Sequence, residues 1–283
     1  MSTSQMIKAS PVRPFLKWAG NKYRILERVL PLIREARAGR LIEPFAGAGA
    51  VFLNAGLPRN RIADVNADLI HLFEDLRDEP VRFVEDSRQL FRPENNCPDV
   101  YYAFREEFNR TPDRHRKNLL FLYMNKHGYN GLCRYNAKGR FNVPFGRYKV
   151  PYFPEKELQA FARAASRATF SCQPFPRTFE EAGAGDVVYC DPPYVPHSTT
   201  ANFSSYNVGG FGPEEQERLA DCAVMAAARG ATVILSNHDN PKTRDLYRGA
   251  RILSFEVRRL ISCNGEKRSR VPELLAIFSP IRN

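Results

Sequence analysis

Apolar residues in the first third of the chain recur with the two periods expected of alternating strands and helices. Short apolar runs at 41–44 and 61–65 have the length of strands, whereas 50–55 and 68–76 are predicted to be helical, the latter with apolar residues at helical spacing. A strand, a turn, a helix and a second strand in this order are typical of the start of a doubly wound α/β sheet.

The last third of the chain repeats this alternation. An apolar run at 185–190 predicts a buried strand, and Pro213 opens a predicted helix that continues to about Arg229. Further strands are predicted at 232–235, 251–257 and 273–278, with a helix from about Pro241. Continuous apolar strands favour a mostly parallel sheet covered by helices on both faces.

In the middle of the chain the alternation of predicted strands and helices is interrupted. It contains helix-like segments at 101–108 and 116–125, then a segment rich in Gly, Asn and Pro in which 136–143 predicts a β-hairpin ending at Pro144. We interpret residues 67–155 as an inserted, mainly helical recognition domain. The flanking segments, 1–66 and 156–283, would then form one discontinuous α/β domain.

The composition is that of a soluble globular protein, with 43% hydrophobic and 26% charged residues among 283. No apolar run approaches the ~20 residues that span a bilayer, and the first ten residues lack the apolar core of a signal peptide. We therefore expect a cytoplasmic protein without a membrane partner. The six cysteines form no CxxC pair, which predicts reduced thiols and no bound metal.

Positive charge is concentrated in one part of the chain. The net charge is +11, and residues 110–150 hold ten Lys or Arg against a single acid, Asp113. The same stretch contains seven Phe or Tyr. Basic residues interleaved with aromatic rings indicate nucleic-acid binding, because cations contact phosphates and rings stack on bases. A basic loop that is merely solvated is the alternative.

A glycine-rich turn, Phe45-Ala46-Gly47-Ala48-Gly49, directly follows the first predicted strand. It lacks the full GxGxxG pattern and the lysine of a phosphate-binding loop, which favours a small nucleoside cofactor over a pyrophosphate. Asp64 ends the second strand, 17 residues after Gly47, where a carboxylate can accept both ribose hydroxyls. The alternatives are a tight turn without a ligand and, for the only tryptophan, Trp18, a place in the core.

Asp191-Pro192-Pro193-Tyr194 follows a buried strand and carries the predicted chemistry. The Asp191 carboxylate and the Pro192 carbonyl can both accept hydrogen bonds from an exocyclic amine, which returns electron density to its nitrogen. The prolines fix φ and remove donors, and Tyr194 offers a face for stacking. In-line attack on a methyl group then gains about 7–11 kcal/mol from proximity. A sharp turn without chemistry is the alternative.

Target and cofactor follow from a resemblance. Phe15-Leu16-Lys17-Trp18-Ala19-Gly20, the 45–49 turn, Asp64-Val65-Asn66 and Asp191–Tyr194 occur in the order found in Dam-family DNA adenine N6-methyltransferases, and 129–136, 141–148 and 236–239 are also similar to that family. The resemblance implies a class I methyltransferase fold, S-adenosylmethionine as methyl donor, no metal, and adenine in 5′-GATC-3′ of double-stranded DNA as acceptor, reached by base flipping. It also implies a monomer in the cytoplasm, associated with the nucleoid.

The resemblance assigns roles to individual residues. Those implied or predicted to line the cofactor site are Trp18, Lys22, Phe45, Gly47, Gly49, Asp64 and Asp191. The implied recognition residues are Lys17, Tyr129, Asn130, Leu132, Arg134 and Pro144. Arg134 suits a bidentate contact with guanine, Tyr129 suits insertion beside the flipped base, and Leu132 and Pro144 suit a thymine methyl group. The predicted phosphate contacts are Lys126, Asn136, Asn142, Arg147 and Lys149.

One residue departs from the family pattern. Asn21 stands where the family usually has a second glycine before the lysine, and asparagine tolerates positive φ better than most residues. Two other functions stay open from the sequence. One is the same chemistry on RNA or on a protein amide, and the other is a DNA-binding regulator without catalysis.

Overall fold

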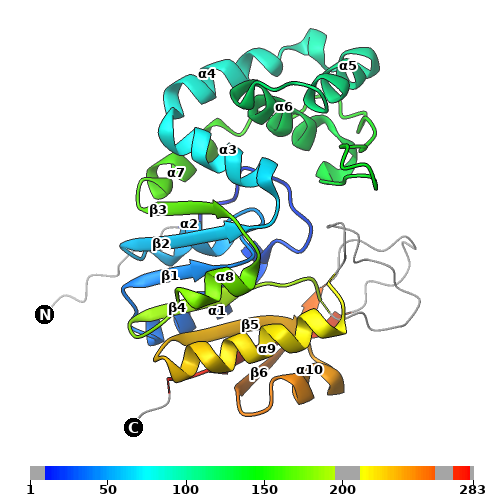
Figure 1. Ribbon diagram of the computed structural model, residues 1–283. Coiled ribbons are helices and arrows are strands. Elements are labelled where there is room, and N and C mark those ends of the chain that lie inside the picture. The colour runs from blue at the N-terminus through cyan, green and yellow to red at the C-terminus, as the bar shows by residue number, and fades with distance from the viewer. Residues whose placement is uncertain (1–9, 195–210, 259–269, 281–283) are drawn as a thin grey trace, which may run out of the picture.

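The computed structural model describes residues 10–194, 211–258 and 270–280 (Figure 1). Seven strands form one sheet in the order β3-β2-β1-β4-β5-β7-β6. They are β1 (Arg40–Glu43), β2 (Arg59–Asp64), β3 (Ala168–Cys172), β4 (Asp186–Cys190), β5 (Thr232–His238), β6 (Arg251–Arg258) and β7 (Arg270–Phe278). All pairings among β1 to β5 are parallel, and only β7 runs antiparallel to its neighbours. The predicted doubly wound, mostly parallel sheet is confirmed.

Helices cover both faces of this sheet (Figure 1). On one face lie α1 (Leu26–Glu35), α2 (Ala50–Ala55), α3 (Ala67–Asp78) and α7 (Glu155–Ala165). On the other face lie α8 (Phe175–Glu180), α9 (Pro213–Ala228) and α10 (Pro241–Leu246). Three short 3₁₀ turns complete the described helical structure, namely η1 (Lys22–Ile25), η2 (Pro93–Asn95) and η3 (Tyr129–Gly131).

Side chains of the central strands alternate between two hydrophobic cores. In β4, Val187 and Tyr189 pack in the core beneath α1 and α2, whereas Val188 and Cys190 pack beneath α8 and α9. All four side chains are buried. Because successive residues of a strand point to opposite faces, a strand between two helical layers is apolar on both faces wherever the two layers cover it. This explains the uninterrupted apolar run in the sequence.

A helical region lies beyond the β3 edge of the sheet (Figure 1). It contains α4 (Pro80–Leu90), α5 (Pro98–Phe108) and α6 (Arg114–His127). Helix α6 packs against α3, α4 and α5, and every residue from Asn118 to His127 is buried. A helix enclosed on all sides shows no amphipathic period. The division at residues 67 and 155 stays a prediction, since α3 contacts both β3 and α6.

The segment after α6 is held by turns and short bridges. At the predicted hairpin, Tyr135 and Phe141 form one antiparallel bridge, and the Asn136 N–H donates to the Arg140 carbonyl over 2.9 Å. A second bridge joins Gly128 to Phe145. The hairpin is therefore a tight turn closed by one bridge.

Candidate active site

The two motifs singled out in the sequence meet at one edge of the sheet. The 45–49 turn follows β1 and residues 191–194 follow β4, and these two strands are parallel neighbours. From β1 the chain crosses to β2 on one side, and from β4 it crosses to β5 on the other. Strand order thus reverses between β1 and β4, which is where open α/β sheets bind their ligands.

Asp191 is fixed by contacts from two distant parts of the chain. The Lys22 ammonium lies 2.6 Å from Asp191 Oδ1, and the Ser236 hydroxyl of β5 lies 3.1 Å from the same oxygen. Lys22 is buried and also donates to the Gly20 carbonyl over 2.7 Å. Within the described residues no hydrogen bond ends on Oδ2 of Asp191, so this oxygen is available to a substrate.

Asn21 fits the turn that precedes Lys22 without adopting a positive φ. Its φ is −47°, and its side-chain oxygen accepts a 3.0 Å hydrogen bond from the Tyr23 N–H, which caps η1. The positive φ of the turn falls instead on Gly20, at +76°. The departure from the family pattern therefore leaves Lys22 in contact with Asp191.

The end of the motif is held by side chains from α9, β5 and β7. The Gln216 amide of α9 donates a 2.7 Å hydrogen bond to the Pro193 carbonyl. The Tyr194 hydroxyl lies 3.4 Å from Glu273 Oε2, and its ring contacts His238 edge-on at 4.8 Å between centroids. Burial raises the pKa of Tyr194 well above its ordinary value, so its hydroxyl stays neutral.

The glycine turn and Asp64 form a second polar cluster. The Gly47 N–H donates to Asp64 Oδ2 over 3.1 Å, and the Asn66 N–H donates to Oδ1 over 3.0 Å. Burial raises the pKa of Asp64, while these N–H groups oppose that shift. Gly47 has a φ of +48°, and a Cβ built there would lie 3.1 Å from the Trp18 indole. The turn therefore requires glycine, and Trp18 packs directly on it.

A buried acceptor without a partner in the described residues lies at the end of β1, just before this turn in the chain. Glu43, the last residue of β1, is 3% exposed, and its Oε2 has no hydrogen-bond partner in the described part of the chain. Burial raises the pKa of Glu43 well above its ordinary value. An orphaned buried oxygen at the end of β1, directly before the glycine turn in the chain, fits a small ligand that brings amino and hydroxyl donors, as S-adenosylmethionine does. The sequence had not suggested Glu43.

Phe45 and Gly49 complete the set predicted around the cofactor. The ring of Phe45 stacks on Phe175 of α8 at 5.4 Å, so it belongs to the core of that face. Gly49 has a φ of +70° and precedes α2. Across 10–194, 211–258 and 270–280, no group of three His, Cys, Asp or Glu is arranged to hold a metal ion.

Most residues predicted to contact DNA are accessible. Exposed side chains among them are Lys17, Tyr129, Asn130, Arg134, Pro144, Arg147 and Lys149, and partly exposed ones are Leu132, Asn136 and Asn142. Lys126 differs, since it is 7% exposed and burial lowers its pKa to about 8, with a contribution from Lys17. Its ammonium is not displayed on the surface as phosphate contacts usually are.

Internal bonds tie the recognition residues to each other. Asn125 of α6 accepts from the Lys17 N–H over 2.9 Å and donates to the carbonyls of Lys17 and Gly131 over 2.8 and 3.2 Å. Arg134 Nε donates to Asn142 Oδ1 over 2.8 Å. Asn125 is 2% exposed, and its only signal in the sequence is that it is a polar residue in an apolar helix.

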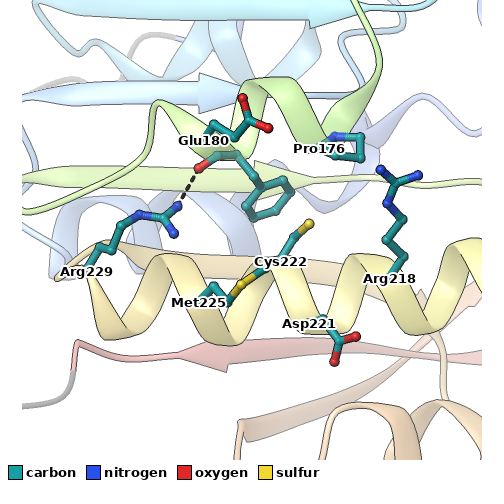
Figure 2. A pocket seen from close by; sticks show the side chains of 8 residues that line it. Pro176, Glu180, Arg218, Asp221, Cys222, Met225 and Arg229 are labelled. Atoms are coloured by element: carbon teal, nitrogen blue, oxygen red, sulfur yellow. Dashed lines mark hydrogen bonds between the residues drawn. The ribbon is translucent and has the colours of Figure 1, made fainter.

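A separate cavity of about 290 Å³ lies between α8 and α9 (Figure 2). Its lining includes Phe179, Cys222 and Met225, and Arg229 donates to the Phe179 carbonyl at its rim over 2.6 Å. None of the residues predicted to bind cofactor or DNA lines it. The cavity is therefore not part of the site at the sheet edge.

Several known proteins are similar to this chain. The "DNA adenine methylase" of Vibrio cholerae serotype O1 is 51% identical over 269 residues, covering 95% of this chain and 96% of that protein. The proteins of the same description from Escherichia coli K12 and Serratia marcescens are each 49% identical over 268 residues, covering 95% and 94% of this chain and 96% and 98% of theirs.

Among solved structures the similarity is distant. The C-terminal domain of precorrin-6Y C5,15-methyltransferase from Rhodobacter capsulatus gives a TM-score of 0.44 at 12% identity, covering 95% of this chain and 97% of that one. An rRNA methyltransferase from Streptomyces viridochromogenes gives 0.41 at 12% identity, with 98% and 94% covered. No helix in the described ranges is long and apolar enough to cross a membrane.

The family itself is identified by the sequence. Residues 18–261 match the family described as D12 class N6 adenine-specific DNA methyltransferase. This match extends from Trp18 across both motifs and the recognition segment, and the relatives named above cover nearly the whole chain. The resemblance seen in the motifs is thereby confirmed, and the chain belongs to the D12 class N6 adenine-specific DNA methyltransferases.

Proposed function

We propose that this protein transfers a methyl group from S-adenosylmethionine to N6 of adenine in double-stranded DNA, within 5′-GATC-3′. The observation that carries the proposal is Asp191, clamped by Lys22 and Ser236 at the point where strand order reverses, with one carboxylate oxygen available. The relatives described as DNA adenine methylases support the substrate. We further propose that the enzyme acts as a cytoplasmic monomer, associated with the nucleoid.

The cofactor would be held by the cluster around the glycine turn. S-adenosylmethionine supplies an electrophilic methyl group on its sulfonium. Asp64 would accept the ribose hydroxyls, Trp18 would cover the turn, and the orphaned Glu43 oxygen would accept a donor of the ligand. Gly47 and Gly49 supply the positive φ values, +48° and +70°, that give the turn its shape.

The acceptor amine would be oriented by two oxygens. Asp191 Oδ2 and the Pro192 carbonyl would accept the N6 hydrogens and direct the nitrogen lone pair toward the methyl group. Lys22 and Ser236 hold Oδ1, which fixes the carboxylate plane before substrate arrives. The Tyr194 ring would stack on the adenine. Attack is direct and in line, without a covalent enzyme intermediate.

Adenine inside a duplex is out of reach, so we propose base flipping, which costs a few kcal/mol. Tyr129 would fill the space left in the stack, Arg134 would read a guanine, and Leu132 and Pro144 would contact a thymine methyl group. Lys17 and Asn130 complete the readers. Asn136, Asn142, Arg147 and Lys149 would contact phosphates, with Lys126 as a further, buried candidate.

The segment from Lys17 to Lys22 links recognition to chemistry. Lys17 is bonded to Asn125 beside the recognition loop, whereas Lys22 touches Asp191. The five steps along the backbone from Lys17 to Lys22 span at most about 18 Å when fully extended. One flipped nucleotide can therefore reach Asp191 while its neighbours are read by the loop.

The direct test is transfer of labelled methyl from S-adenosylmethionine to two short duplexes, one with GATC and one with its guanine replaced. Transfer to the first alone is expected. Equal transfer to both would remove the proposed readers but keep the chemistry. A matched RNA duplex tests the other acceptor class, and cofactor binding without transfer to any substrate would favour a regulator.

A further inference from the structure

A chain of buried polar groups lies directly behind residues 191–194. Gln216 Nε2 donates to the Pro193 carbonyl over 2.7 Å, and Asn237 Nδ2 donates to Gln216 Oε1 over 3.2 Å and to the Tyr247 hydroxyl over 2.9 Å. The exposed fractions of Gln216, Asn237 and Tyr247 are 2%, 0% and 1%. These residues come from α9, from β5 and from the end of α10. Three elements thus converge on a single backbone carbonyl.

The prolines explain why this carbonyl matters. Neither Pro192 nor Pro193 has an N–H, so this part of the loop can be anchored only through its carbonyl oxygens. In the proposed mechanism the Pro192 carbonyl must remain available to the adenine amine. The Pro193 carbonyl is then the backbone group through which the two-proline segment can be held.

Gln216 is well suited to hold it. A side-chain amide hidden from water is costly unless its donors and acceptors are paired, so the bond from Asn237 selects one orientation of the Gln216 amide. In that orientation the nitrogen faces Pro193 and the oxygen faces Asn237. The direction of the Gln216 donor is therefore set before any ligand binds.

We propose that Gln216 is a positioning residue for methyl transfer, which fixes the Pro192–Pro193 backbone so that the Pro192 carbonyl faces the adenine amine. This inference rests on the proposed function. Gln216 would affect the rate of methyl transfer in the complex with cofactor and DNA. Tyr247, at the far end of the chain of hydrogen bonds, would affect only the stability of the fold.

The experiment compares Gln216→Met with Tyr247→Phe in the full-length protein. Gln216→Met keeps the length of the side chain but removes the donor, and we expect kcat on a GATC duplex to fall by about 10- to 100-fold, the cost of a misplaced acceptor. The Kd for S-adenosylhomocysteine, measured by calorimetry, should stay close to that of the wild type. Tyr247→Phe should lower Tm while leaving kcat close to that of the wild type.

Gln216→Glu adds a readout that a purely structural role would not move. A protonated Glu can donate to Pro193, whereas an ionised one cannot, so the ratio of variant to wild-type kcat should rise as pH falls. Burial raises the pKa of Tyr247 to about 12, so that hydroxyl stays neutral throughout. The titratable residues of the neighbouring loop and strands, Asp191, Tyr194, His238 and Glu273, occur in both proteins, so the comparison is made on the ratio of the two kcat values.

The outcomes separate the two proposals. Wild-type kcat in Gln216→Met, or equal losses of kcat in Gln216→Met and Tyr247→Phe, would overturn the positioning role alone. A wild-type protein that transfers no methyl to duplex DNA would overturn the proposed function and this inference with it. If Gln216→Met does not fold, a flat kcat ratio for Gln216→Glu across pH overturns the role of Gln216.

Discussion

The proposed catalytic edge of the sheet and the loop at 128–149, proposed to bind DNA, are built in opposite ways. At the proposed catalytic edge, Asp191 and Tyr194 are bonded to side chains of the protein itself, from η1, β5 and β7. In the loop, Tyr129 is 52% exposed and Arg134 is exposed, with its guanidinium bonded to Asn142 of the same loop. One region is fixed in advance, and the other displays its side chains to solvent.

This difference corresponds to what each region must do. Charge that develops during methyl transfer is stabilised best by acceptors already in place, because no reorganisation is then required. Base reading needs side chains that reach out of the protein, and their ordering is completed when DNA binds. Substitutions at the catalytic edge should therefore change rate, and substitutions in the loop should change the choice of sequence.

The largest effect is expected for Asp191→Ala. Removing the carboxylate removes one of the two proposed acceptors for the N6 hydrogens, and we expect kcat to fall by at least about 10²- to 10³-fold. Duplex binding should change little, because the loop is untouched. Single-turnover methylation and fluorescence anisotropy with the same GATC duplex measure the two quantities.

Ser236→Ala is the matched control for this change. It removes one contact on Oδ1 but leaves the ion pair with Lys22 at 2.6 Å. A much smaller loss of kcat is expected. If Asp191→Ala retained turnover, the catalytic role of Asp191 would be wrong. If it lost DNA binding in parallel with turnover, the proposed separation of catalysis and DNA binding between the two regions would be wrong.

An intermediate effect is expected for Arg134→Ala. Loss of a bidentate contact with guanine should reduce discrimination against a replaced guanine by about 1–3 kcal/mol in kcat/KM. Arg140→Ala serves as control, because Arg140 lies in the same turn but pairs with Glu106 at 2.6 Å. Equal selectivity in the Arg134 variant and the wild type would remove Arg134 from the readers.

The sequence predicted the catalytic edge better than its surroundings. The turn at 45–49 and the motif at 191–194 could be placed because each directly follows an apolar strand, and parallel strands present their carboxyl ends at one edge. Ser236, Gln216 and Glu43 could not be found in this way. Their roles depend on which residues from distant elements they meet, which no local pattern encodes.

The burial of residues within a helix also limited what could be predicted from the sequence. Lys126 was predicted as a phosphate contact from its charge in a basic segment, yet it lies in a stretch of α6 that is enclosed on every side. Charge alone does not reveal which side of a helix is covered. Strand β3 was not predicted for a different reason. Its five residues include Thr169, Ser171 and Cys172 and lack a strong apolar run.

The smallest expected effect is on stability rather than on rate. The pH dependence of the unfolding free energy should have opposite signs at one carboxyl in each of the two regions. Burial raises the pKa of Glu43 at the catalytic edge, whereas the hydrogen bond from Arg140 lowers the pKa of Glu106 in the recognition region. A raised carboxyl pKa stabilises the fold below the unfolded pKa, and this stability is lost as pH rises toward the folded value. A lowered pKa stabilises the fold above the unfolded value, and this stability is lost as pH falls.

Glutamine at each position removes the titration while keeping the size of the side chain. Unfolding free energies of the ligand-free protein between pH 5 and 8 should show Glu43→Gln gaining on the wild type as pH rises. Glu106→Gln should be slightly less stable than the wild type at neutral pH and converge with it in acid. Parallel curves for Glu43→Gln and the wild type would mean that no proton is taken up at Glu43 on folding. Glu43 would then be an ionised carboxylate at the end of β1. A ligand donor near its Oε2 would in that event be attracted by the negative charge, and the argument from an unpaired neutral acceptor would be wrong.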